Sequence, residues 1–574
     1  MRFLPGLTLA RRYQREWLRY DLAAGVVLTA LLVPQGMAYA ELAGLPPVTG
    51  IYATMIPLLA YALFGPSRIL IVGPDSAIAP VVAATVIPLA GAAPGDRVAV
   101  AATLAAAVGI LCVIGGLARL GFVTDLLSMP VRIGYLAGIA VVVIVDQLAA
   151  VLGVDVESEG LFLTVAELVE SLGEADLVTA AIGLGTIAIL VAFRRFLPRG
   201  PGALVVVVAG IALVVLLGLE GQVATVGEVP AGLPTPAMPA LDPTQLPPIL
   251  LGALAIALVA FADTSVLSRS YAARLGDRVD PDQELFALGA VNVAASFFQG
   301  FPVSSSSSRT PAAEAAGAKS QLTGVVAAIA LGLVLLFATG IFAPLPQATL
   351  SAIVIVAVAG LFDVYSLRRL AVLNRADFGL ATAALLGVAL IGVIPGIGIA
   401  IGLSVMTLLW RAWHPYTAVL GRVDGLKGYH DRERHPEGRQ IPGLVIFRFD
   451  APLFFANADR FREAVLDAVD EVEGPVRRVI VAAEPITDVD TTAADTVDEL
   501  LGRLDRAKIG LVLAELKGPV KDKVRRYGLE ERFAQPAFPR TVGEAVHDYL
   551  EEFQVPWTDW EDAEEHEAGR GRAR

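Results

Sequence analysis

The chain has 574 residues, of which 55% are hydrophobic and only 18% are charged, and its mean hydropathy is +0.65. Soluble proteins carry about 25% charged residues, so this composition excludes a disordered chain and argues against a soluble enzyme. The charge is unevenly spread, because 46 of residues 1–413 are charged, against 55 of the 161 residues in 414–574. This split predicts a polytopic membrane domain followed by a soluble domain. The net charge of −13 argues against nucleic acid as a partner.

Fourteen apolar segments in residues 1–413 are candidate membrane spans, since a spanning helix needs about 20 apolar residues. They run over 22–40, 48–64, 77–92, 98–118, 131–152, 177–193, 202–219, 246–267, 284–300, 306–317, 321–343, 346–362, 378–394 and 396–413. The tenth is too short to span a bilayer alone. Pro395 and Gly396 divide one long uncharged run into the last two spans.

The basic residues between these spans predict the orientation. If the arginine-rich N-terminus is cytoplasmic, the loops after even-numbered spans are cytoplasmic too. Those loops carry Arg68, Arg119, Arg194, Arg195, Arg199, Arg269, Arg274, Arg278, Lys319, Arg368, Arg369, Arg375 and Arg411. The loops after odd-numbered spans carry Arg97 and several acidic residues. We therefore expect a multi-pass protein of the cell membrane with both termini cytoplasmic and no cleavable signal peptide.

The charged part of the chain alternates strand-like and helix-like patterns, which predicts a small α/β domain over residues 443–555. Expected strands are 444–449, 478–483 and 509–514, and expected helices are 458–472, 491–506, 519–527 and 541–553. Residues 414–442 are expected to form a linker. Residues 556–574 are acidic and then rich in Arg and Gly, which predicts a disordered tail.

Ionisable residues at membrane depth are costly to bury, so each is a functional candidate. The candidates are Asp75, Arg132, Asp146, Asp263, Arg309 and Glu314. Asp263, near the end of the eighth span, is interpreted as a carboxylate that binds a coupling cation, either H⁺ or Na⁺. The alternative for Asp263 is a structural ion pair or an acid facing cytoplasmic water. Arg132 and Asp146 are interpreted as structural or interfacial.

Two helix breaks predict an anion site within the membrane. In the tenth span, five serines precede Arg309, and Pro311 fits the first turn of a helix, where its missing N–H costs nothing. Free backbone N–H groups at such a helix start attract anions, and Arg309 adds a formal positive charge. The alternative is a flexible polar loop at the surface.

The second break, residues 73–77 with the sequence GPDSA, lies in the third span. The third and tenth spans are the third of each half of the chain, and paired interrupted segments of this kind mark transporter binding sites. Asp75 is an acidic residue in this break, and it could cap the helix, titrate or pair with Arg309. In the first span, Gln35 and Tyr39 lie one turn apart on one face, where they could donate hydrogen bonds to a ligand or pack between helices.

These residues resemble the sulfate permease (SulP) family of anion transporters. The first span carries the sequence LVPQGMAYAELAGLPP over residues 32–47, and a second block begins with DQEL at residues 282–285. Gly300-Phe301-Pro302 and Ser308-Arg309-Thr310 continue the second block. The tail resembles a STAS domain, including PLFFANA over residues 452–458.

The resemblance implies fourteen helices in two inverted repeats of seven, with a core domain that moves against a gate domain in elevator-type alternating access. It implies an anion bound between the facing ends of the third and tenth helices, and a homodimer in the bilayer. The substrate-site positions of the family match Gln35, Tyr39, Asp75, Ser76, Ala77, Ser307, Ser308 and Arg309. Its coupling-ion position matches Asp263, with Ser304 and Ser305 beside it.

This sequence departs from the family pattern in two places. Ser305-Ser306-Ser307 replaces a commoner Thr-Gly-Ser-like pattern, and Asp75 stands where many relatives have an uncharged residue. In the tail, Thr491 and Thr492 follow Asp490 in the turn where some STAS domains carry a phosphorylatable Ser. These threonines could accept phosphate, or they could simply cap the following helix, which is the interpretation we favour.

The sequence therefore predicts a secondary active transporter of a small inorganic oxyanion, sulfate or bicarbonate, in symport with H⁺ or Na⁺. A dicarboxylate transporter, an anion channel, a nucleobase permease and a membrane sensor that signals through its STAS domain are the alternatives. No metal-ligand cluster, nucleophile elbow or nucleotide-phosphate loop occurs in the sequence, so we expect no enzymatic activity. We also expect no cofactor and no metal beyond a coupling ion, such as Na⁺ at Asp263.

Overall fold

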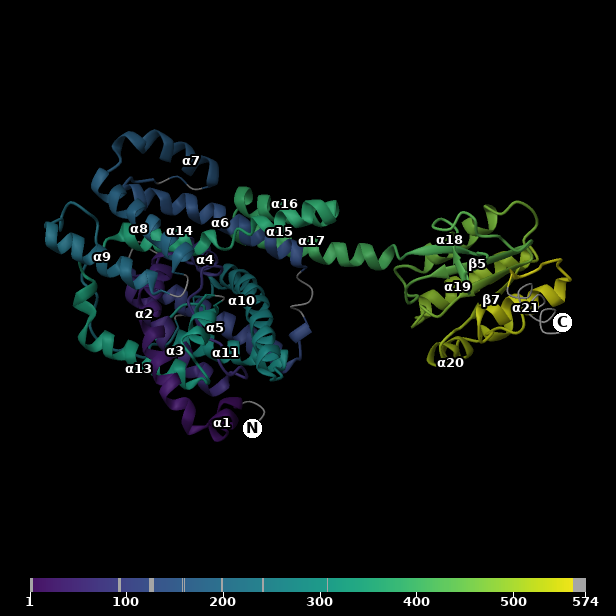
Figure 1. Ribbon diagram of the computed structural model, residues 1–574, viewed down its shortest axis with the longest axis horizontal. Helices are drawn as coiled ribbons and strands as arrows, with labels where there is room; N and C mark the ends of the chain where they lie inside the picture. Colours follow the sequence, from purple (N-terminus) through teal and green to yellow (C-terminus); the bar gives the residue numbers. More distant parts are fainter. Residues whose placement is uncertain are drawn as a thin grey trace, which may run out of the picture. The chain divides into compact units, whose positions relative to one another are not determined.

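The computed structural model describes residues 4–90, 94–122, 128–156, 158, 160–197, 200–239, 242–306 and 308–560. The chain forms two compact units, Met1–Val405 and Met406–Arg574 (Figure 1). The first unit is helical apart from two short strands, β1 (Val72–Gly73) and β2 (Ser304–Ser305). The second unit contains a mixed sheet covered by helices.

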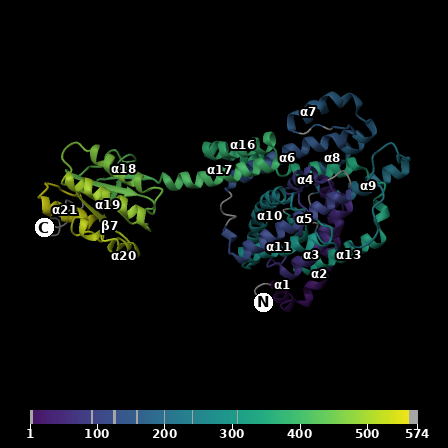
Figure 2. The ribbon, with the colours of Figure 1, turned by 180° about the vertical axis from the view of Figure 1, so that it is seen from behind.

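Each of the fourteen predicted spans coincides with a helix (Figures 1 and 2). In chain order the helices are α2 (Leu18–Leu42), α3 (Pro47–Phe64), α4 (Ala79–Leu89), α5 (Pro94–Leu117), α6 (Met129–Leu152), α8 (Leu177–Phe196), α9 (Gly202–Leu217), α10 (Leu246–Leu275), α11 (Pro281–Ser296), α12 (Arg309–Ala315), α13 (Leu322–Phe337), α14 (Gln347–Ala359), α16 (Arg375–Leu386) and α17 (Val393–Trp413). Short helices α1 (Pro5–Arg11), α7 (Leu161–Glu170) and α15 (Val364–Leu373) lie between them. As predicted, the third and tenth segments, α4 and α12, are short.

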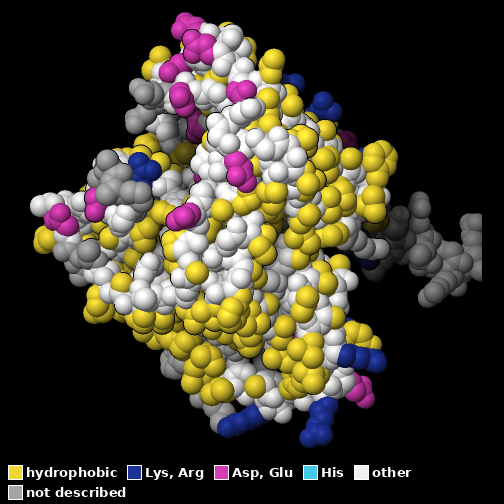
Figure 3. All heavy atoms as spheres, turned by 90° about the vertical axis from the view of Figure 1, so that its left-hand side faces the viewer, with side chains coloured by type: hydrophobic (Ala, Val, Ile, Leu, Met, Phe, Trp, Pro, Cys, Tyr) yellow, Lys and Arg dark blue, Asp and Glu magenta, His cyan; other side chains and the backbone are white. Residues whose placement is uncertain are grey.

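The surface of this unit has the character expected of a protein in lipid. In the described part of the chain, eight helices are long and apolar enough to cross a bilayer. Large side chains such as Leu216 and Phe337 are 82% exposed, although they are fully apolar. Figure 3 shows hydrophobic side chains over much of the face on which α7 and α9 lie, with acidic side chains gathered in its upper part. Such a surface is stable only in contact with acyl chains.

The spanning helices pack into two bundles. In the first, α3, α5 and α10 pack around α11, α4 packs on α5 and α10, and α13 packs on α2 and α3. In the second, α6 packs on α8, α14 and α16, and α9 packs on α8. We call the first set, α2–α5 with α10–α13, the core bundle, and the second, α6, α8, α9, α14 and α16, the gate bundle. The contacts of α2 with α9 and α14 join them.

Close packing inside the core bundle depends on glycine. A Cβ atom on Gly50 of α3 would lie 1.8 Å from the carbonyl oxygen of Gly36 in α2. A Cβ atom on Gly289 of α11 would lie 2.7 Å from the carbonyl oxygen of Gly109 in α5. Lipid chains are as apolar as the helices, so the hydrophobic effect adds little, and close backbone contact supplies much of the attraction between spans.

A buried carboxylate fixes the start of α2 to the start of α13. Asp21 is fully buried and accepts hydrogen bonds from the backbone N–H groups of Lys319 (2.7 Å) and Ser320 (3.1 Å). The hydroxyls of Ser320 (2.6 Å) and Thr323 (3.0 Å) also donate to it. Asp21 therefore satisfies N–H groups that precede α13 and would otherwise lack partners. The sequence analysis did not single out this residue.

The second unit has a five-stranded sheet with the order β4-β3-β5-β6-β7. The strands are β3 (Thr417–Arg422), β4 (Tyr429–Asp431), β5 (Leu444–Phe449), β6 (Arg478–Ala482) and β7 (Gly510–Ala514). β5, β6 and β7 are parallel, whereas β3 runs antiparallel to both β4 and β5. Alternate residues of β5 enter opposite cores: Phe447 packs against one and Ile446 against the other.

Helices cover both faces of this sheet. The core on one face includes residues of α18 (Ala458–Asp470), α19 (Thr491–Arg506) and α20 (Gly518–Arg526), and the core on the other face includes residues of α21 (Val542–Phe553). The three parallel strands and all four helices lie where the sequence predicts them. The small α/β domain is therefore confirmed.

Two predictions about the edges of this domain are wrong. Residues 414–442 are not a linker, because they contain β3 and β4 of the sheet. Both strands contain polar residues, and β4 has only 3 residues, so their sequence lacks the apolar run by which β5 to β7 were predicted. The expected tail 556–574 begins in ordered structure: Arg422 donates to Asp559 at 2.8 Å, and the Arg439 guanidinium lies 4.7 Å from the Trp557 ring centroid. Residues 561–574 lie outside the described residues.

The interpretation that Thr491 and Thr492 cap α19 is also wrong. The cap is Asp490, whose carboxylate accepts hydrogen bonds from the backbone N–H groups of Ala493 (2.7 Å) and Phe455 (2.8 Å). A carboxylate accepts with both oxygens, so it outcompetes a hydroxyl for this position. Thr491 and Thr492 are exposed in the first turn, and their phosphorylation stays a prediction.

The α2–α3 contact predicts a stability difference between two glycine substitutions. Gly50→Ala forces a Cβ atom into backbone that cannot move without separating the helices, which should cost about 1–3 kcal/mol. Thermal unfolding of the purified protein should show a lower Tm for Gly50→Ala. The control is Gly185→Ala in α8, where no heavy atom lies within 4 Å of the added carbon. An equal Tm for the two variants would contradict the packing argument.

The Asp490 cap predicts a second difference, in the C-terminal unit. Asp490→Ala should destabilise the start of α19 by about 1 kcal/mol, because two backbone N–H groups lose their partner. Thr491→Ala should change the stability by less than about 0.5 kcal/mol. Hydrogen exchange of α19 amides in the full chain measures both effects. Faster exchange in Thr491→Ala than in Asp490→Ala would restore the threonine as the cap.

Candidate functional site

The two predicted helix breaks meet in space. β1 precedes α4, β2 precedes α12, and the two strands pair antiparallel, with Val72 opposite Ser305 and Gly73 opposite Ser304. Ser306 extends the pairing, because its backbone N–H donates to the carbonyl of Ile71 at 3.2 Å. The starts of α4 and α12 are thereby held next to each other, as expected of facing half-helices.

Short polar side chains begin each half-helix. The Asp75 carboxylate accepts a hydrogen bond from the backbone N–H of Ala77 at 3.0 Å, and its carbonyl accepts one from Ala79 at 3.0 Å. The carboxylate thus closes the turn that leads into α4, whose N-cap residue is Ile78 and has no side-chain cap. The predicted cap at Asp75 is therefore not formed. On the other side, the Ser306 hydroxyl accepts a hydrogen bond from the backbone N–H of Arg309 at 3.3 Å and lies 3.1 Å from the Ser308 hydroxyl.

Arg309 ties the second break to the first. Its side chain is 1% exposed, and one terminal nitrogen donates to the carbonyl of Pro74. The guanidinium fits there because residue 73 is glycine: a Cβ atom would lie 2.7 Å from Nη1 of Arg309. Within the described residues, its Nε and Nη1 atoms have no hydrogen-bond partner. A positive charge thus lies buried directly beside the crossing of the two breaks.

A cavity of about 430 Å³ lies in front of this crossing. Its core-bundle wall is formed by Gln35, Tyr39, Asp75, Ser76 and Ser308. The gate-bundle wall is mainly apolar, and its side chains come from the end of α8, the start of α9 and the end of α14. They include Leu190, Phe193, Ala203, Ile353, Val356 and Leu361, together with Arg194.

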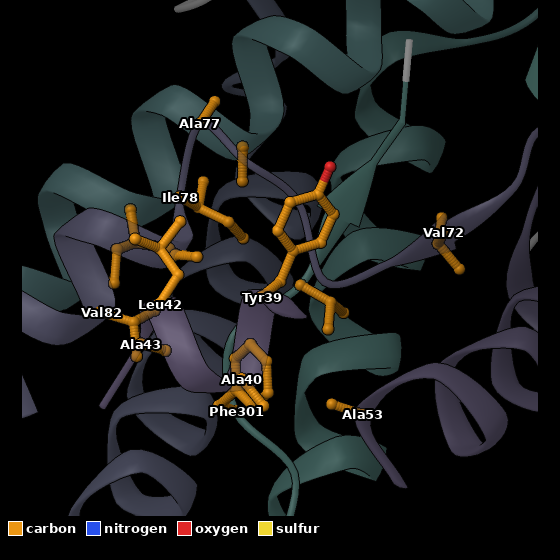
Figure 4. Packing of buried hydrophobic residues seen from close by; sticks show 14 of the residues in the cluster. Tyr39, Ala40, Leu42, Ala43, Ala53, Val72, Ala77, Ile78, Val82 and Phe301 are labelled. Carbon is orange, nitrogen blue, oxygen red and sulfur yellow. The ribbon is translucent and has the colours of Figure 1, made fainter. Parts of the chain in front are cut away.

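Five of the eight predicted substrate-binding residues therefore line one cavity. Ala77 and Arg309 are buried beside it and do not line it, and Ser307 lies outside the described residues. Figure 4 shows the ring of Tyr39 within the buried core, with Ile78 and Ala77 on one side of it and Val72 on the other. In the described part of the chain, the Gln35 carbonyl oxygen is buried without a hydrogen-bond partner. Arg194, which the sequence analysis noted only for its contribution to orientation, also faces this space.

The predicted coupling residue takes part in an ion pair between the two bundles. Asp263 of α10, in the core bundle, lies 3.1 Å from a terminal nitrogen of Arg132 in α6, in the gate bundle. The side chains are 17% and 32% exposed, so water screens the pair only partly. The pair matches the structural alternative for Asp263, and it gives Arg132 a partner that sequence spacing did not indicate.

Hydroxyl residues follow Asp263 in α10, at positions 264 and 265, and form β2, at positions 304 and 305. The Thr264 hydroxyl accepts a hydrogen bond from the backbone N–H of Ser305 at 3.2 Å. The hydroxyls of Ser265 and Ser305 are buried and lack hydrogen-bond partners among the described residues, whereas the Ser304 hydroxyl donates to the Ser305 carbonyl at 3.1 Å. Carboxylate and hydroxyl oxygens suit a hard cation such as Na⁺. In this structure the Arg132 guanidinium is the cation next to Asp263.

A second buried carboxylate escaped the sequence analysis. Glu284 of α11 is fully buried and accepts hydrogen bonds from the hydroxyls of Tyr61 (2.6 Å) and Ser268 (2.5 Å). It joins α3, α10 and α11 within the core bundle. The signal was available, since Glu284 belongs to the quoted DQEL motif, but its position near the start of a span made it look like a helix-end acid.

Comparison with known proteins identifies the family of both parts of the chain. The model of the sulfate permease family matches residues 18–384, and the model of the STAS domain matches residues 435–545. A probable sulfate transporter of Mycobacterium tuberculosis is 40% identical over 94% of this chain and 97% of its own length. Human solute carrier family 26 member 6 is 35% identical over 81% of this chain and 65% of its own length.

Solved structures share the fold. Murine Solute Carrier 26 family member A9, an anion transporter in the inward-facing state, matches with a TM-score of 0.86 at 22% identity, over 95% of this chain and 93% of that one. The transmembrane domain of a cyanobacterium bicarbonate transporter, BicA, matches with a TM-score of 0.59 at 23% identity, over 69% of this chain and 98% of that one. The family model covers most of the chain, and the mycobacterial relative matches it almost from end to end. This chain therefore belongs to the sulfate permease family of anion transporters and carries a C-terminal STAS domain.

Proposed function

We propose that this protein is a secondary active transporter that moves a small inorganic oxyanion across the cell membrane by elevator-type alternating access. Sulfate is the first candidate, because relatives that match nearly the whole chain are named sulfate transporters, and bicarbonate is the second. One observation carries the proposal: the two helix breaks and five polar residues of the core bundle meet at one cavity between the bundles.

The core wall offers what an oxyanion needs when it leaves water. The amide of Gln35 and the hydroxyls of Tyr39, Ser76 and Ser308 can each donate a hydrogen bond. The buried charge of Arg309 stabilises an anion from behind this wall, and because the site is largely shielded from water its field is weakly screened. The negative charge of Asp75 opposes the positive charge of Arg309. The site therefore favours ligands that accept several hydrogen bonds over ligands that are held by charge alone.

The gate wall allows the core bundle to slide past it. Its apolar side chains make no hydrogen bonds that would have to break when the core bundle slides past them. An anion held by the core bundle alone can therefore travel with it, which is the requirement of an elevator mechanism. We expect both termini in the cytoplasm from the distribution of basic residues. The cavity lies where α8 ends, so this structure would represent an inward-facing state.

The coupling ion would act at the ion pair between the bundles. A cation that neutralises Asp263 competes with Arg132 and weakens the connection between the core and gate bundles. Binding of H⁺ or Na⁺ at this carboxylate would thereby be linked to movement of the core bundle.

We also propose a homodimer, on the basis of the family resemblance alone.

Transport by purified protein in liposomes tests the function directly. Labelled sulfate, bicarbonate and fumarate are offered separately, each under a pH gradient or a sodium gradient. We expect saturable sulfate uptake that is accelerated by one of the two gradients. Preferred fumarate uptake would indicate a dicarboxylate transporter, and currents that do not saturate with anion concentration would indicate a channel. A lack of uptake for every anion would favour a membrane sensor.

The ion pair predicts the behaviour of a single variant. Asp263→Asn removes the charge that a coupling cation must neutralise, so gradient-driven sulfate uptake should fall to background. Exchange of labelled for unlabelled sulfate, at equal concentrations on the two sides of the membrane, should persist. The control is Glu314→Gln, because Glu314 pairs with Arg274 at 2.9 Å in a solvent-accessible position. Undiminished gradient-driven uptake by Asp263→Asn would refute the coupling role.

A further inference from the structure

Arg194 is a charged residue of the gate wall that the proposed mechanism does not use. Among the described residues that line the cavity, only Asp75 and Arg194 carry a formal charge. Arg194 lies in the last turn of α8, and its guanidinium rests against the chain just after α14: a Cβ atom on Gly360 would lie 3.5 Å from Nη2 of Arg194. Within the described part of the chain, no acidic side chain pairs with Arg194.

Orientation rules alone do not explain why Arg194 faces the cavity. A basic residue at this helix end satisfies both the positive-inside rule and the helix dipole. Arg195 satisfies them equally well, and its guanidinium lies 6.0 Å from the ring of Phe196 and does not line the cavity. Of the two neighbouring arginines, therefore, only Arg194 faces the cavity.

The core-bundle wall presents no positive charge at the surface of the cavity. Arg309 is buried behind the core wall, and the only charge that the core wall itself presents is the Asp75 carboxylate, which repels anions. A guanidinium offers a planar pair of N–H donors that matches two oxygens of an oxyanion. Screening in bulk solution acts over about 8 Å, so the Arg194 charge is felt within the cavity.

We propose that Arg194 captures the oxyanion from the gate side. Its guanidinium binds the anion as it passes between the cytoplasm and the core wall, opposite Tyr39 and Ser76. This inference rests on the proposed function, since it assumes that an anion passes through this cavity. Because Arg194 belongs to the gate bundle, the contact forms in the state described here and is lost when the core bundle carries the anion away. Arg194 should therefore affect anion affinity on one side of the membrane only.

The chain allows a charge-specific test. Its single native cysteine, Cys112, is buried at 1% exposure, so thiol reagents should address a cysteine introduced at position 194. Arg194→Cys should raise the KM for sulfate about tenfold or more at the cytoplasmic face, the loss expected for a hydrogen bond to a charged group. Reaction of this cysteine with a positively charged methanethiosulfonate should restore part of the sulfate affinity. Reaction with a negatively charged methanethiosulfonate should weaken the affinity further. Bound sulfate should slow the reaction of the cysteine with either reagent.

Arg195→Cys is the matched control, because it removes the same charge from the neighbouring residue. We expect its KM for sulfate to stay within about twofold of the wild-type value with either reagent. Arg194→Gln serves as a second variant if the cysteine variant does not fold. A KM unchanged in Arg194→Cys or in Arg194→Gln, or an equal response of positions 194 and 195 to the reagents, would overturn the role of Arg194. Failure of the wild-type protein to transport any anion would instead overturn the proposed function.

Discussion

The site depends on one constraint: a helix that is interrupted inside a membrane leaves backbone groups that neither water nor the helix can satisfy. Here two interruptions satisfy each other. The short ladder between β1 and β2 pairs the two strands, Asp75 and Ser306 accept N–H groups at the helix starts, and Arg309 donates to the Pro74 carbonyl. Of the residues in the two breaks, Asp75, Ser76 and Ser308 line the cavity, whereas Nε and Nη1 of Arg309 stay buried beside it. The same pairing that stabilises the breaks therefore leaves polar groups available for a ligand.

The cavity has two walls of different chemistry because it lies between two separately packed bundles. Polar groups come from α2 and the two breaks of the core bundle, whereas α8, α9 and α14 supply mainly apolar side chains. Charged contacts across the boundary are few, and each has a distinct place. The Asp263–Arg132 pair lies where α10 approaches α6, and Arg194 lies at the end of α8. Besides the packing of α2 on α9 and α14, the bundles are therefore joined by an ion pair whose strength a small ion can alter.

The sequence predicted the features that depend on local pattern. Hydropathy and length located the spans, glycine and proline located the breaks, and charge density located the C-terminal unit. It could not predict contacts between distant residues: Arg132 and Asp263 are 131 positions apart, and the side chain of Arg309 turned out to face the first break instead of the cavity. Strands β3 and β4 were missed because β3 is fixed by its pairing with β5, and β4 by its pairing with β3, which single-sequence periodicity does not record.

The contact between Gly73 and Arg309 has a consequence for how this protein can vary. The guanidinium occupies the space that any side chain at position 73 would need, although the two residues are 236 positions apart. A larger residue at position 73 therefore requires the end of the Arg309 side chain to shift from its place beside the Pro74 carbonyl. A substitution at position 73 would thus move the buried positive charge of residue 309, although neither residue lines the cavity.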